Sequence, residues 1–581
     1  MSFDGYLIDT DGIYGFYVNN KGNITNQRLV CERFDVVKSV MRVKNISDSI
    51  PKFTTVLEIP LKDGTNNYVR LANSLLASSP IKVLSNEGLN SIDTRDNNEV
   101  VSEVIRDIRK TLDYSYDYDT IGFISHKGKE LFVYSEVVPS DSSIFVDENT
   151  KPRSKGTFEE WKDNLSPFIS ERPELQLALA MGASAPVVAK LKNCGIFSDS
   201  IIWGIVGMSS QGKTSALKLS ASVWHGADIA TGDIRTMLDT ENFFFGELAG
   251  RYGVPYFVDE ASSSKEDQSK RIYQISMNHD RGRCKPDGTP KVPKSWLGAV
   301  TFTSETSLFG QSNNNSGLYA RLVEFSFRWT KDKKSADEML KAINKYYGTA
   351  WKPFVTELMN VSNGDLELLY IFYCEELNNK VSPKTGVEER IIQRLAILLI
   401  TVDVMIEAWD IKFDKEAIIK LLVDTFKENI SRIDRVDAIY EDLLQYIVMH
   451  RAQFPDKSEN STVMFAEASK TGSIEKRKDR KCAWILADFV AQFFSGKGLT
   501  LNKDVKKELY NRGYIERFGD KYQKYHTISN LDAPCICFFI DKQPSNDKEP
   551  DKKPVVKKTT SNLAKANSKI NLLLSEDEDA C

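Results

Sequence analysis

The chain has 581 residues, which is enough for three or four domains of ordinary size. Hydrophobic residues make up 41% of the sequence and charged residues 27%, so we expect a soluble protein with a sizeable core. No apolar run approaches the ~20 residues that span a bilayer, and acids stand where a signal peptide has basic residues, which indicates a cytoplasmic protein without membrane contact. A net charge of −4 excludes a protein that coats nucleic acid with its whole surface, although not one with a local basic patch.

Cysteine and histidine spacing does not support a metal motif. The eight cysteines are scattered, and the nearest two, Cys535 and Cys537, have one residue between them. Because the sequence has no Cys-x-x-Cys pair, neither a zinc ribbon nor a thioredoxin-type motif is supported. With five histidines in the chain, a histidine-based metal site is not indicated either, and we expect reduced, structural cysteines.

Residues 1–150 predict a β-rich N-terminal domain, because short apolar runs alternate there with turn signals. The clearest runs are Gly15–Val18, Thr54–Ile59, Thr120–Ile124 and Leu131–Tyr134. Helical patterns interrupt them near Leu71–Ala77 and Val100–Leu112. The acidic residues are scattered over the segment, so no catalytic constellation is predicted. A polar hinge over residues 150–165 follows.

A buried strand, a glycine loop and a helix follow one another between residues 200 and 224. Ser200–Gly207 is a continuous apolar run typical of a buried central strand, and Thr214–Trp224 has a helical pattern. A preceding helix is predicted over Glu171–Leu191, where we expect Pro186 to kink or split it. Strand, loop and helix follow in the order that a phosphate-binding P-loop requires.

The loop matches the pattern G-x-x-x-x-G-K-[ST] over Gly207–Thr214. Its glycines let backbone N–H groups face phosphate oxygens, and the helix that follows adds its positive N-terminal end. Lys213 would reach the β- and γ-phosphates of ATP, and Thr214 would ligate Mg²⁺. The residues predicted to bind ATP are Gly207, Met208, Ser209, Ser210, Gln211, Gly212, Lys213, Thr214 and Ser215.

A second apolar strand, Val254–Glu260, ends in two acids. In P-loop ATPases, the first acid of such a pair helps to hold Mg²⁺ and the second activates the attacking water as a general base. We therefore predict Asp259 as a metal ligand and Glu260 as the base. A strand that simply ends in solvent-facing acids is the alternative.

Two more candidate groups are a polar strand end and an arginine. The apolar strand Trp296–Glu305 ends in Thr303 and Ser304, and either hydroxyl could face the γ-phosphate. We take Ser304 as the catalytic candidate and leave Thr303 open, with a strand-end cap as the simpler role.

Arg321 precedes another apolar strand and is suited to reach the ATP of a neighbouring subunit as an arginine finger. A surface salt bridge is the alternative for Arg321.

A basic insertion over residues 281–296 lies between the second and third strands. Its single acid, Asp287, forms a tight-turn dipeptide with Gly288. In a ring-shaped ATPase such an insertion would project into the pore, where its charge would track a phosphate backbone without reading bases. The DNA contacts predicted here are Lys285, Lys291 and Lys294, and an ordinary exposed loop is the alternative.

Together these motifs resemble the bacterial and phage helicase-like AAA+ family that includes the replicative helicases of staphylococcal cassette-chromosome mobile elements. The resemblance covers most of residues 1–430, through Gly207–Thr214, Ala216-Leu217, Ala221–Trp224, Thr240–Asn242, Asp259-Glu260, Ile272-Tyr273, Trp296, Thr303–Glu305 and Gly317–Arg321. It implies a ring motor similar to minichromosome-maintenance helicases, with Thr303 or Ser304 as the sensor 1 residue and Arg390 or Arg394 as the sensor 2 arginine. The family carries Gly and Lys where this chain has Asn278–Arg283, which leaves the roles of Arg281 and Arg283 open.

The remaining sequence predicts a helical lid or bundle over residues 331–455, a small α/β unit over 460–540 and a disordered tail over 543–581. In the small unit, a basic helix over Leu501–Arg512 precedes a predicted hairpin over Tyr514–Lys524. This order is similar to a winged helix, whose second helix would meet duplex DNA. Its predicted DNA contacts are Lys503, Lys506 and Lys507, and a basic protein-contact domain is the alternative.

The predicted fold class is α/β, an AAA+ P-loop ATPase core over residues 165–330 with a β-rich N-terminal domain, a helical lid and a C-terminal winged-helix-like domain. The predicted function is an ATP- and Mg²⁺-dependent DNA helicase for replication of a mobile element, a homo-hexamer that binds single-stranded and duplex DNA. A non-unwinding AAA+ ATPase and an ATP-switched DNA-binding initiator or loader are the alternatives. In the tail, Leu572–Leu574 ahead of Glu576–Asp579 would dock a replication protein, unless the tail is simply disordered.

Overall fold

The structure is a computed structural model, and it describes residues 3–43, 53–148, 151–261, 269–284, 286–308, 318, 320–433, 435–456, 470–477, 480–497, 499, 501–528 and 531–541. Its residue contacts divide the chain into two compact units, Met1–Arg435 and Val436–Cys581. The predicted tail over residues 543–581 lies outside the described residues.

The first unit begins with two sheets. The first is antiparallel in the order β1-β2-β3, with β1 (Gly5–Ile8), β2 (Gly12–Val18) and β3 (Ile24–Glu32). The second has the order β6-β5-β4-β7, with β4 (Asp35–Val43), β5 (Phe53–Pro60), β6 (Asn66–Ala72) and β7 (Tyr114–Tyr118). Helices α1 (Pro80–Asn86) and α2 (Arg95–Lys110) follow a short 3-10 turn at Asn73–Ala77, so the helical pattern near Leu71–Ala77 becomes a strand end and this turn. The apolar face of α2 packs against the strands in one core.

A third sheet joins the N-terminal region to the next part of the unit. Its order is β10-β9-β8-β13, with β8 (Ile121–His126), β9 (Lys129–Val133), β10 (Val137–Val138) and β13 (Arg251–Tyr252). Gly122 has a φ of +96°, and a Cβ there would overlap the carbonyl oxygen of Tyr252, so only glycine allows this approach. Phe132 and Tyr134 belong to the same core as Trp224. The packing therefore continues across residue 150, where the sequence predicted the end of the N-terminal domain.

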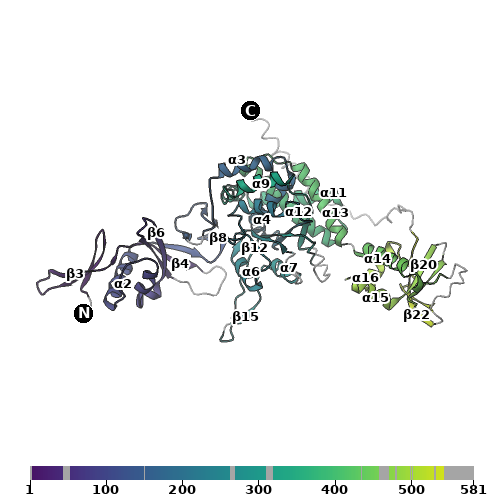
Figure 1. The fold of residues 1–581 in the computed structure, drawn as a ribbon, viewed down its shortest axis with the longest axis horizontal. Helices are drawn as coiled ribbons and strands as arrows, with labels where there is room; N and C mark the ends of the chain where they lie inside the picture. The colour runs from purple at the N-terminus through teal and green to yellow at the C-terminus, as the bar shows by residue number, and fades with distance from the viewer. Residues whose placement is uncertain are drawn as a thin grey trace, which may run out of the picture. The chain divides into compact units, whose positions relative to one another are not determined.

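A five-stranded parallel sheet lies among the helices of the first unit (Figure 1). Its order is β12-β14-β17-β11-β18, with β11 (Ile201–Val206), β12 (Arg235–Thr236), β14 (Tyr256–Asp259), β17 (Ala299–Ser304) and β18 (Leu322–Phe325). Every residue of β11, β14, β17 and β18 is buried, as expected for the apolar runs that form them. Because the strands are parallel, their carboxyl ends meet at one edge of the sheet.

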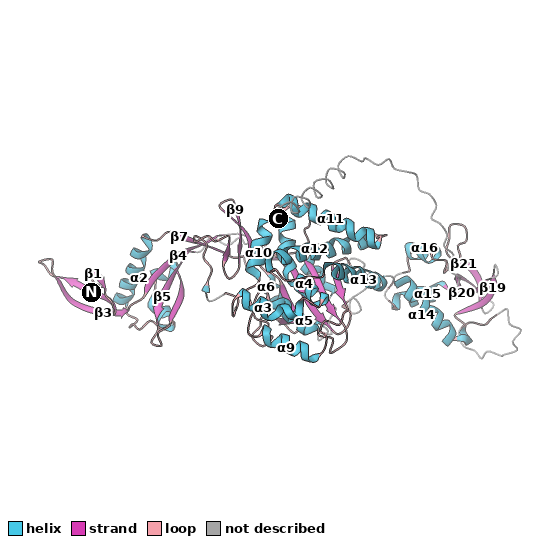
Figure 2. Ribbon diagram, turned by 90° about the horizontal axis from the view of Figure 1, so that it is seen from above, coloured by secondary structure: helices cyan, strands magenta, loops and turns pink. Residues whose placement is uncertain are grey.

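Helices pack around this sheet (Figure 2). Their bounds are α3 (Phe158–Ile169), α4 (Pro173–Asn193), α5 (Lys213–Ser222), α6 (Glu241–Leu248), α7 (Ser269–Ser276), α9 (Lys333–Ile343), α10 (Trp351–Asn360), α11 (Asn363–Val381), α12 (Gly386–Trp409) and α13 (Lys415–Ile433). Helix α3 begins inside the predicted hinge, because Thr157 and Glu160 form a capping box. No helix in the described part of the chain combines the length and apolar character that a membrane span requires.

Helix α4 is continuous through Pro186, so the helix is not split there. Proline has no N–H to donate to the carbonyl of Gly182, four residues earlier. The indole N–H of Trp224 donates to that carbonyl instead, at 3.0 Å. A buried tryptophan thus replaces the hydrogen bond that the proline removes.

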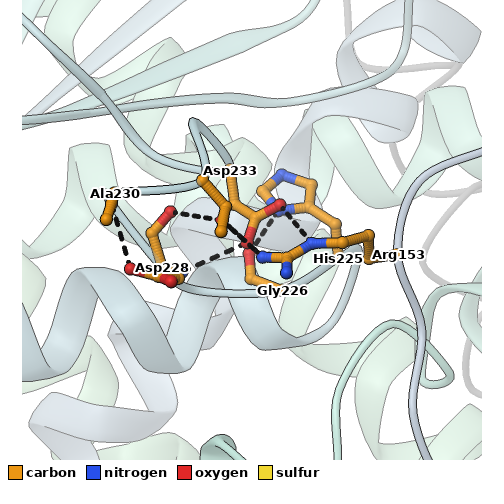
Figure 3. Close-up of polar contacts among 7 residues, drawn as sticks. Arg153, His225, Gly226, Asp228, Ala230 and Asp233 are labelled. Atoms are coloured by element: carbon orange, nitrogen blue, oxygen red, sulfur yellow. Dashed lines mark hydrogen bonds and ion pairs between the residues drawn. The ribbon is translucent and has the colours of Figure 1, made fainter.

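The loop that follows α5 is closed by an ion pair (Figure 3). Nε of Arg153 donates to Oδ1 of Asp233 at 3.2 Å, and Oδ2 of Asp233 accepts from the backbone N–H of Asp228. The ring of His225 lies at the start of this loop, with Nδ1 2.6 Å from the carbonyl oxygen of Gly226. Arg153 belongs to the predicted hinge, so the hinge segment is fixed to the central part of the unit.

The second unit comprises α14 (Arg435–Met449), β19 (Gly472–Arg477), β20 (Arg480–Leu486), α15 (Ala487–Gly496), α16 (Lys503–Asn511), β21 (Lys524–Ile528) and β22 (Leu531–Phe539), with a 3-10 turn at Arg451–Gln453. Its sheet has the order β19-β20-β22-β21. Helix α14, which the sequence placed with the helical segment 331–455, shares a core with this sheet through Tyr440 and Leu443. The predicted hairpin over Tyr514–Lys524 is a tight turn at Phe518–Lys521, and the long hairpin is β21–β22.

Candidate functional site

The predicted P-loop lies at the carboxyl end of β11, where α5 begins at Lys213. Gly212 has a φ of +83°, and a Cβ there would overlap the hydroxyl of Thr330. The backbone N–H of Trp329 donates to the carbonyl of Gln211 at 2.9 Å. The segment after β18 therefore holds the loop from one side. This contact was not predicted, because no sequence motif marks Trp329 or Thr330.

The threonine of the loop contacts the acid at the end of β14, whereas the lysine contacts the loop itself. Lys213 is 9% exposed, and its ammonium donates to the carbonyl of Met208 at 2.8 Å. The hydroxyl of Thr214 donates to Oδ1 of Asp259 at 3.3 Å. Strand β17 lies between β11 and β14, so the parallel register brings these groups to the same edge of the sheet. Met208, Ser209 and Ser210 are exposed at the mouth of the loop, whereas Ser215 is buried in α5.

Thr303 joins this group, and Ser304 does not. The hydroxyl of Thr303 donates to the carboxylate of Asp259 and accepts from the backbone N–H of Glu260 at 2.9 Å. The hydroxyl of Ser304 donates instead to the carbonyl of Thr306 at 2.6 Å. The structure thus places Thr303 beside the two acids, although Ser304 was the candidate chosen from the sequence. Alternate residues of a strand face opposite ways, so only one of the two hydroxyls can face the acids.

The oxygen atoms at this edge suit a magnesium ion. Mg²⁺ prefers oxygen ligands and keeps several waters, so protein sites for Mg²⁺ with phosphates supply one or two side chains. The hydroxyl of Thr214 and the carboxylate of Asp259 are the two candidates, and their 3.3 Å contact shows that both face one point. Within the described ranges, no group of three or more His, Cys, Asp or Glu side chains is arranged to hold a metal ion.

Arg321 lies at the opposite end of the sheet from the P-loop of the same chain. It directly precedes β18, where Leu322 pairs with Ile202 near the start of β11. At 3.3 Å per residue, the P-loop that begins at Gly207 is roughly 15 Å further along the strands. The guanidinium of Arg321 lies over the ring of Tyr273 from α7, 4.7 Å from its centroid. Arg321 therefore cannot serve its own P-loop in this conformation.

The two candidate arginines of α12 differ in burial. Arg390 is exposed, whereas Arg394 is 2% exposed and lies with its guanidinium 3.4 Å from the carboxylate of Asp199. Burial lowers the pKa of Arg394 to about 10, with Asp199 opposing this shift and the charge of Arg321 adding to it. Asp199 precedes β11, so Arg394 shares with Arg321 the end of the sheet that lies away from the P-loop.

The basic insertion forms a hairpin of two short strands, β15 (Arg283–Cys284) and β16 (Pro290–Lys291), beside α6 (Figure 1). Arg281 contacts the carboxylate of Glu241, and Nη2 of Arg283 donates to Oδ1 of Asn242 at 2.6 Å. Among the predicted DNA contacts, Lys294 is exposed, Lys291 lies in β16, and Lys285 is outside the described residues.

In the second unit, the three predicted DNA contacts lie on α16. Lys503 and Lys507 are exposed and four residues apart, so they share one face of the helix. Lys506 is half-buried, and its ammonium donates to Oε1 of Gln523 at 3.2 Å. Helix α16 thus presents at least two lysines to solvent.

Comparisons with known proteins agree with this architecture. Residues 6–295 match the family model described as "Domain of unknown function (DUF927)", and residues 434–543 match "Cch helix turn helix domain". No curated protein sequence matches the chain. The solved structure "SCCmec type IV Cch - active helicase" is 20% identical, with a TM-score of 0.72, over 93% of this chain and 98% of that one. The chain therefore has the fold of this Cch protein, and its second unit corresponds to the Cch-type helix-turn-helix model.

Proposed function

We propose that this chain is an ATP-hydrolysing motor of the AAA+ type that unwinds DNA during replication of a mobile genetic element. The observation that carries the proposal is the meeting of Lys213, Thr214, Asp259, Glu260 and Thr303 at the carboxyl ends of three adjacent parallel strands. A buried structural sheet needs no such set of a lysine, two hydroxyls and two acids at one edge.

The chemistry follows from the roles of these groups. Lys213 would hold the β- and γ-phosphates of ATP, and Thr214 and Asp259 would hold Mg²⁺, which neutralises phosphate charge when bound. Glu260 would accept the proton of the attacking water as general base. Thr303 accepts from the backbone N–H of Glu260 and so would help to position this base.

The position of Arg321 supports a shared active site. Because Arg321 lies at the end of the sheet away from its own P-loop, it can reach a nucleotide only on a neighbouring copy, whereas Arg394 is buried against Asp199. We infer a closed homo-oligomer, for which the resemblance favours a hexamer, with Arg321 as the finger that stabilises charge on the transferred phosphoryl group. The β15–β16 hairpin and α16 are the proposed contacts to single-stranded and duplex DNA.

A strand-displacement assay on a forked DNA duplex, with and without ATP, tests the proposal. A helicase displaces the labelled strand only with hydrolysable ATP, and Glu260→Gln abolishes the displacement. ATP hydrolysis that DNA stimulates, without displacement on either fork polarity, would favour the non-unwinding ATPase. ATP-dependent DNA binding that Glu260→Gln leaves unchanged, together with slow hydrolysis, would favour the switched initiator or loader.

A further inference from the structure

A groove separates α6 from the β15–β16 hairpin, and it lies apart from the ATP site. Its volume is about 170 Å³. The residues that line it are Asn242, Gly246, Asp280, Arg281, Arg283, Val292, Pro293 and Lys294. Because its walls come from the hairpin and the helix, its shape depends on the contacts of Arg281 and Arg283 with the start of α6.

Gly246 forms the helical side of this groove, and the helix itself gives no reason for a glycine there. Glycine inside a helix costs roughly 0.5–1 kcal/mol relative to alanine. The backbone of Gly246 is helical, and a Cβ built on it has no atom within 4 Å. Neither the backbone conformation of Gly246 nor the packing around it therefore requires a residue without a side chain. What a larger side chain at position 246 would change is the space in the groove.

The charge of the groove suits an anion. Three basic side chains and one acid line it, and the carboxylate of that acid, Asp280, accepts from the backbone N–H of Arg281 at 2.7 Å. Arg281 is paired with the carboxylate of Glu241. Arg283 instead donates to the neutral amide of Asn242, and this contact does not neutralise the positive charge of Arg283. Lys294 is exposed at the same groove. Guanidinium groups bind phosphate oxygens with several donors at once, so an anion can add to these contacts.

An aromatic ring beside the groove favours nucleic acid over other anions. Phe243 is 43% exposed, although the two phenylalanines that follow it in α6 are almost fully buried. Phe243 lies three residues before Gly246, so the two are neighbours on the helix surface. The guanidinium of Arg235 lies 4.9 Å from the ring centroid and is held by Glu247 at 2.9 Å, which fixes the ring. Proteins that bind single strands combine basic grooves with such exposed rings, on which bases stack.

We propose that the groove between α6 and the β15–β16 hairpin holds one phosphate of a single-stranded nucleic acid, and that Phe243 stacks on an adjoining base. The site rests on the proposed function, since through it the motor would contact the single-stranded nucleic acid at the base of the β15–β16 hairpin. It assigns roles to Arg283 and Gly246 that no motif indicates.

Binding of a fluorescent oligothymidylate to the full-length protein, measured by anisotropy over a range of salt concentrations, tests the site. Gly246→Leu fills the groove and should weaken binding about 10-fold, with the slope of log K against log salt reduced by about 0.7, the value for one lost phosphate on a single strand. Gly246→Ala should bind like wild type. Phe243→Ala should weaken binding by about 5-fold or more without changing the slope, because stacking releases no counterions.

Gly386→Leu is the matched control, since Gly386 is also an exposed helical glycine with open space around it. The basal ATPase rate without DNA should be the same in all four variants. If Gly246→Leu binds the oligonucleotide with wild-type affinity and slope, the groove proposal is wrong while the proposed function stands. If the wild-type protein binds no single-stranded DNA at all, both the groove proposal and the proposed function are wrong.

Discussion

The backbone N–H of Glu260 donates to the hydroxyl of Thr303 at 2.9 Å, and the same hydroxyl contacts the carboxylate of Asp259. Glu260 has a φ of 54°, in the left-handed region that residues other than glycine rarely adopt. Such a backbone costs of order 1–3 kcal/mol and persists only where neighbours hold it. Thr303 therefore holds the backbone of the proposed base in this conformation.

Thr303→Val should lower kcat for ATP hydrolysis about 100-fold while ATP affinity stays within a few-fold of wild type, because the contact positions the base rather than the nucleotide. Thr303→Ser should retain most of the activity. Ser304→Ala serves as the control, since its hydroxyl bonds only the carbonyl of Thr306 in the described contacts. A larger loss in Ser304→Ala than in Thr303→Val would contradict this assignment.

Lys213→Ala and Glu260→Gln should fail at different steps. Lys213→Ala removes the point charge that would hold the β- and γ-phosphates, so a fluorescent ATP analogue should no longer bind tightly. Glu260→Gln keeps that charge but cannot accept the proton of water, so it should bind the analogue normally and hydrolyse ATP at least about 100-fold more slowly. Hydrolysis near the wild-type rate in Lys213→Ala would rule out this active site.

Mixing two inactive variants should restore part of the ATPase activity. Arg321→Ala leaves the P-loop intact, and Lys213→Ala leaves the arginine intact, so some interfaces in a mixed oligomer pair two functional halves. A finger of this kind is worth roughly 10³–10⁵ in rate, so even partial restoration is measurable. If mixed oligomers form, as shown by cross-linking of differently tagged chains, and no activity returns, Arg321 does not act across an interface.

Gly122→Ala should destabilise the protein by at least about 3 kcal/mol, because a Cβ there overlaps the carbonyl oxygen of Tyr252 in addition to the strain of a positive φ. Gly128→Ala separates the two effects. Gly128 has a φ of +80° and open space around its Cβ, so alanine there should cost about 1 kcal/mol. Urea unfolding of both variants measures the difference, and equal midpoints would show that β8 and β13 can separate freely.

Acid should weaken the fold through His225. Burial lowers the pKa of His225 from 6.5 to about 4, with the charges of Arg251 and Arg153 acting in the same direction and Asp233 and the Gly226 carbonyl opposing it. The unfolded chain takes up this proton below pH 6.5 and the folded chain does not, so stability present above pH 6.5 is lost as the pH falls towards 4. At about 1.4 kcal/mol per pKa unit, the loss is at most about 3 kcal/mol.

Urea unfolding at pH 7 and pH 5 measures this loss, and His225→Gln should reduce the difference between the two pH values. His279→Gln is the control, because His279 is exposed. A pH dependence that both variants share with wild type would assign the effect to other groups.

The sequence predicted those parts of the fold that a local pattern specifies. The strands β11, β14 and β17 are continuous apolar runs, and a motif marks the loop between β11 and α5. The order of these elements along the chain could therefore be predicted from the sequence. The continuity of α4 could not be predicted, because the group that replaces the hydrogen bond lost at Pro186 is Trp224, far along the chain. The packing across residue 150 was missed for the same reason, since β13 lies over a hundred residues after β8.

In the candidate site, the residue types were predictable and their orientation was not. Thr303 and Ser304 both end β17, and only the register with β14 determines which hydroxyl faces Asp259. Arg321 was chosen for its place before β18, whereas its distance from its own P-loop follows only from the pairing of Leu322 with Ile202. Gly246 was missed because a lone glycine in a short helix carries no pattern.

The placement of Arg321 and the P-loop at opposite ends of parallel strands restricts the symmetry of any assembly that uses both. A two-fold dimer uses the same patch on both copies, so it completes its two sites only if that one patch contains both the P-loop and Arg321. A head-to-tail contact completes one site per interface, and its repetition gives either a closed ring or an open helical filament. An open chain always leaves one P-loop at one end and one arginine at the other without a partner. Closure is therefore the step at which the last site of the assembly becomes complete.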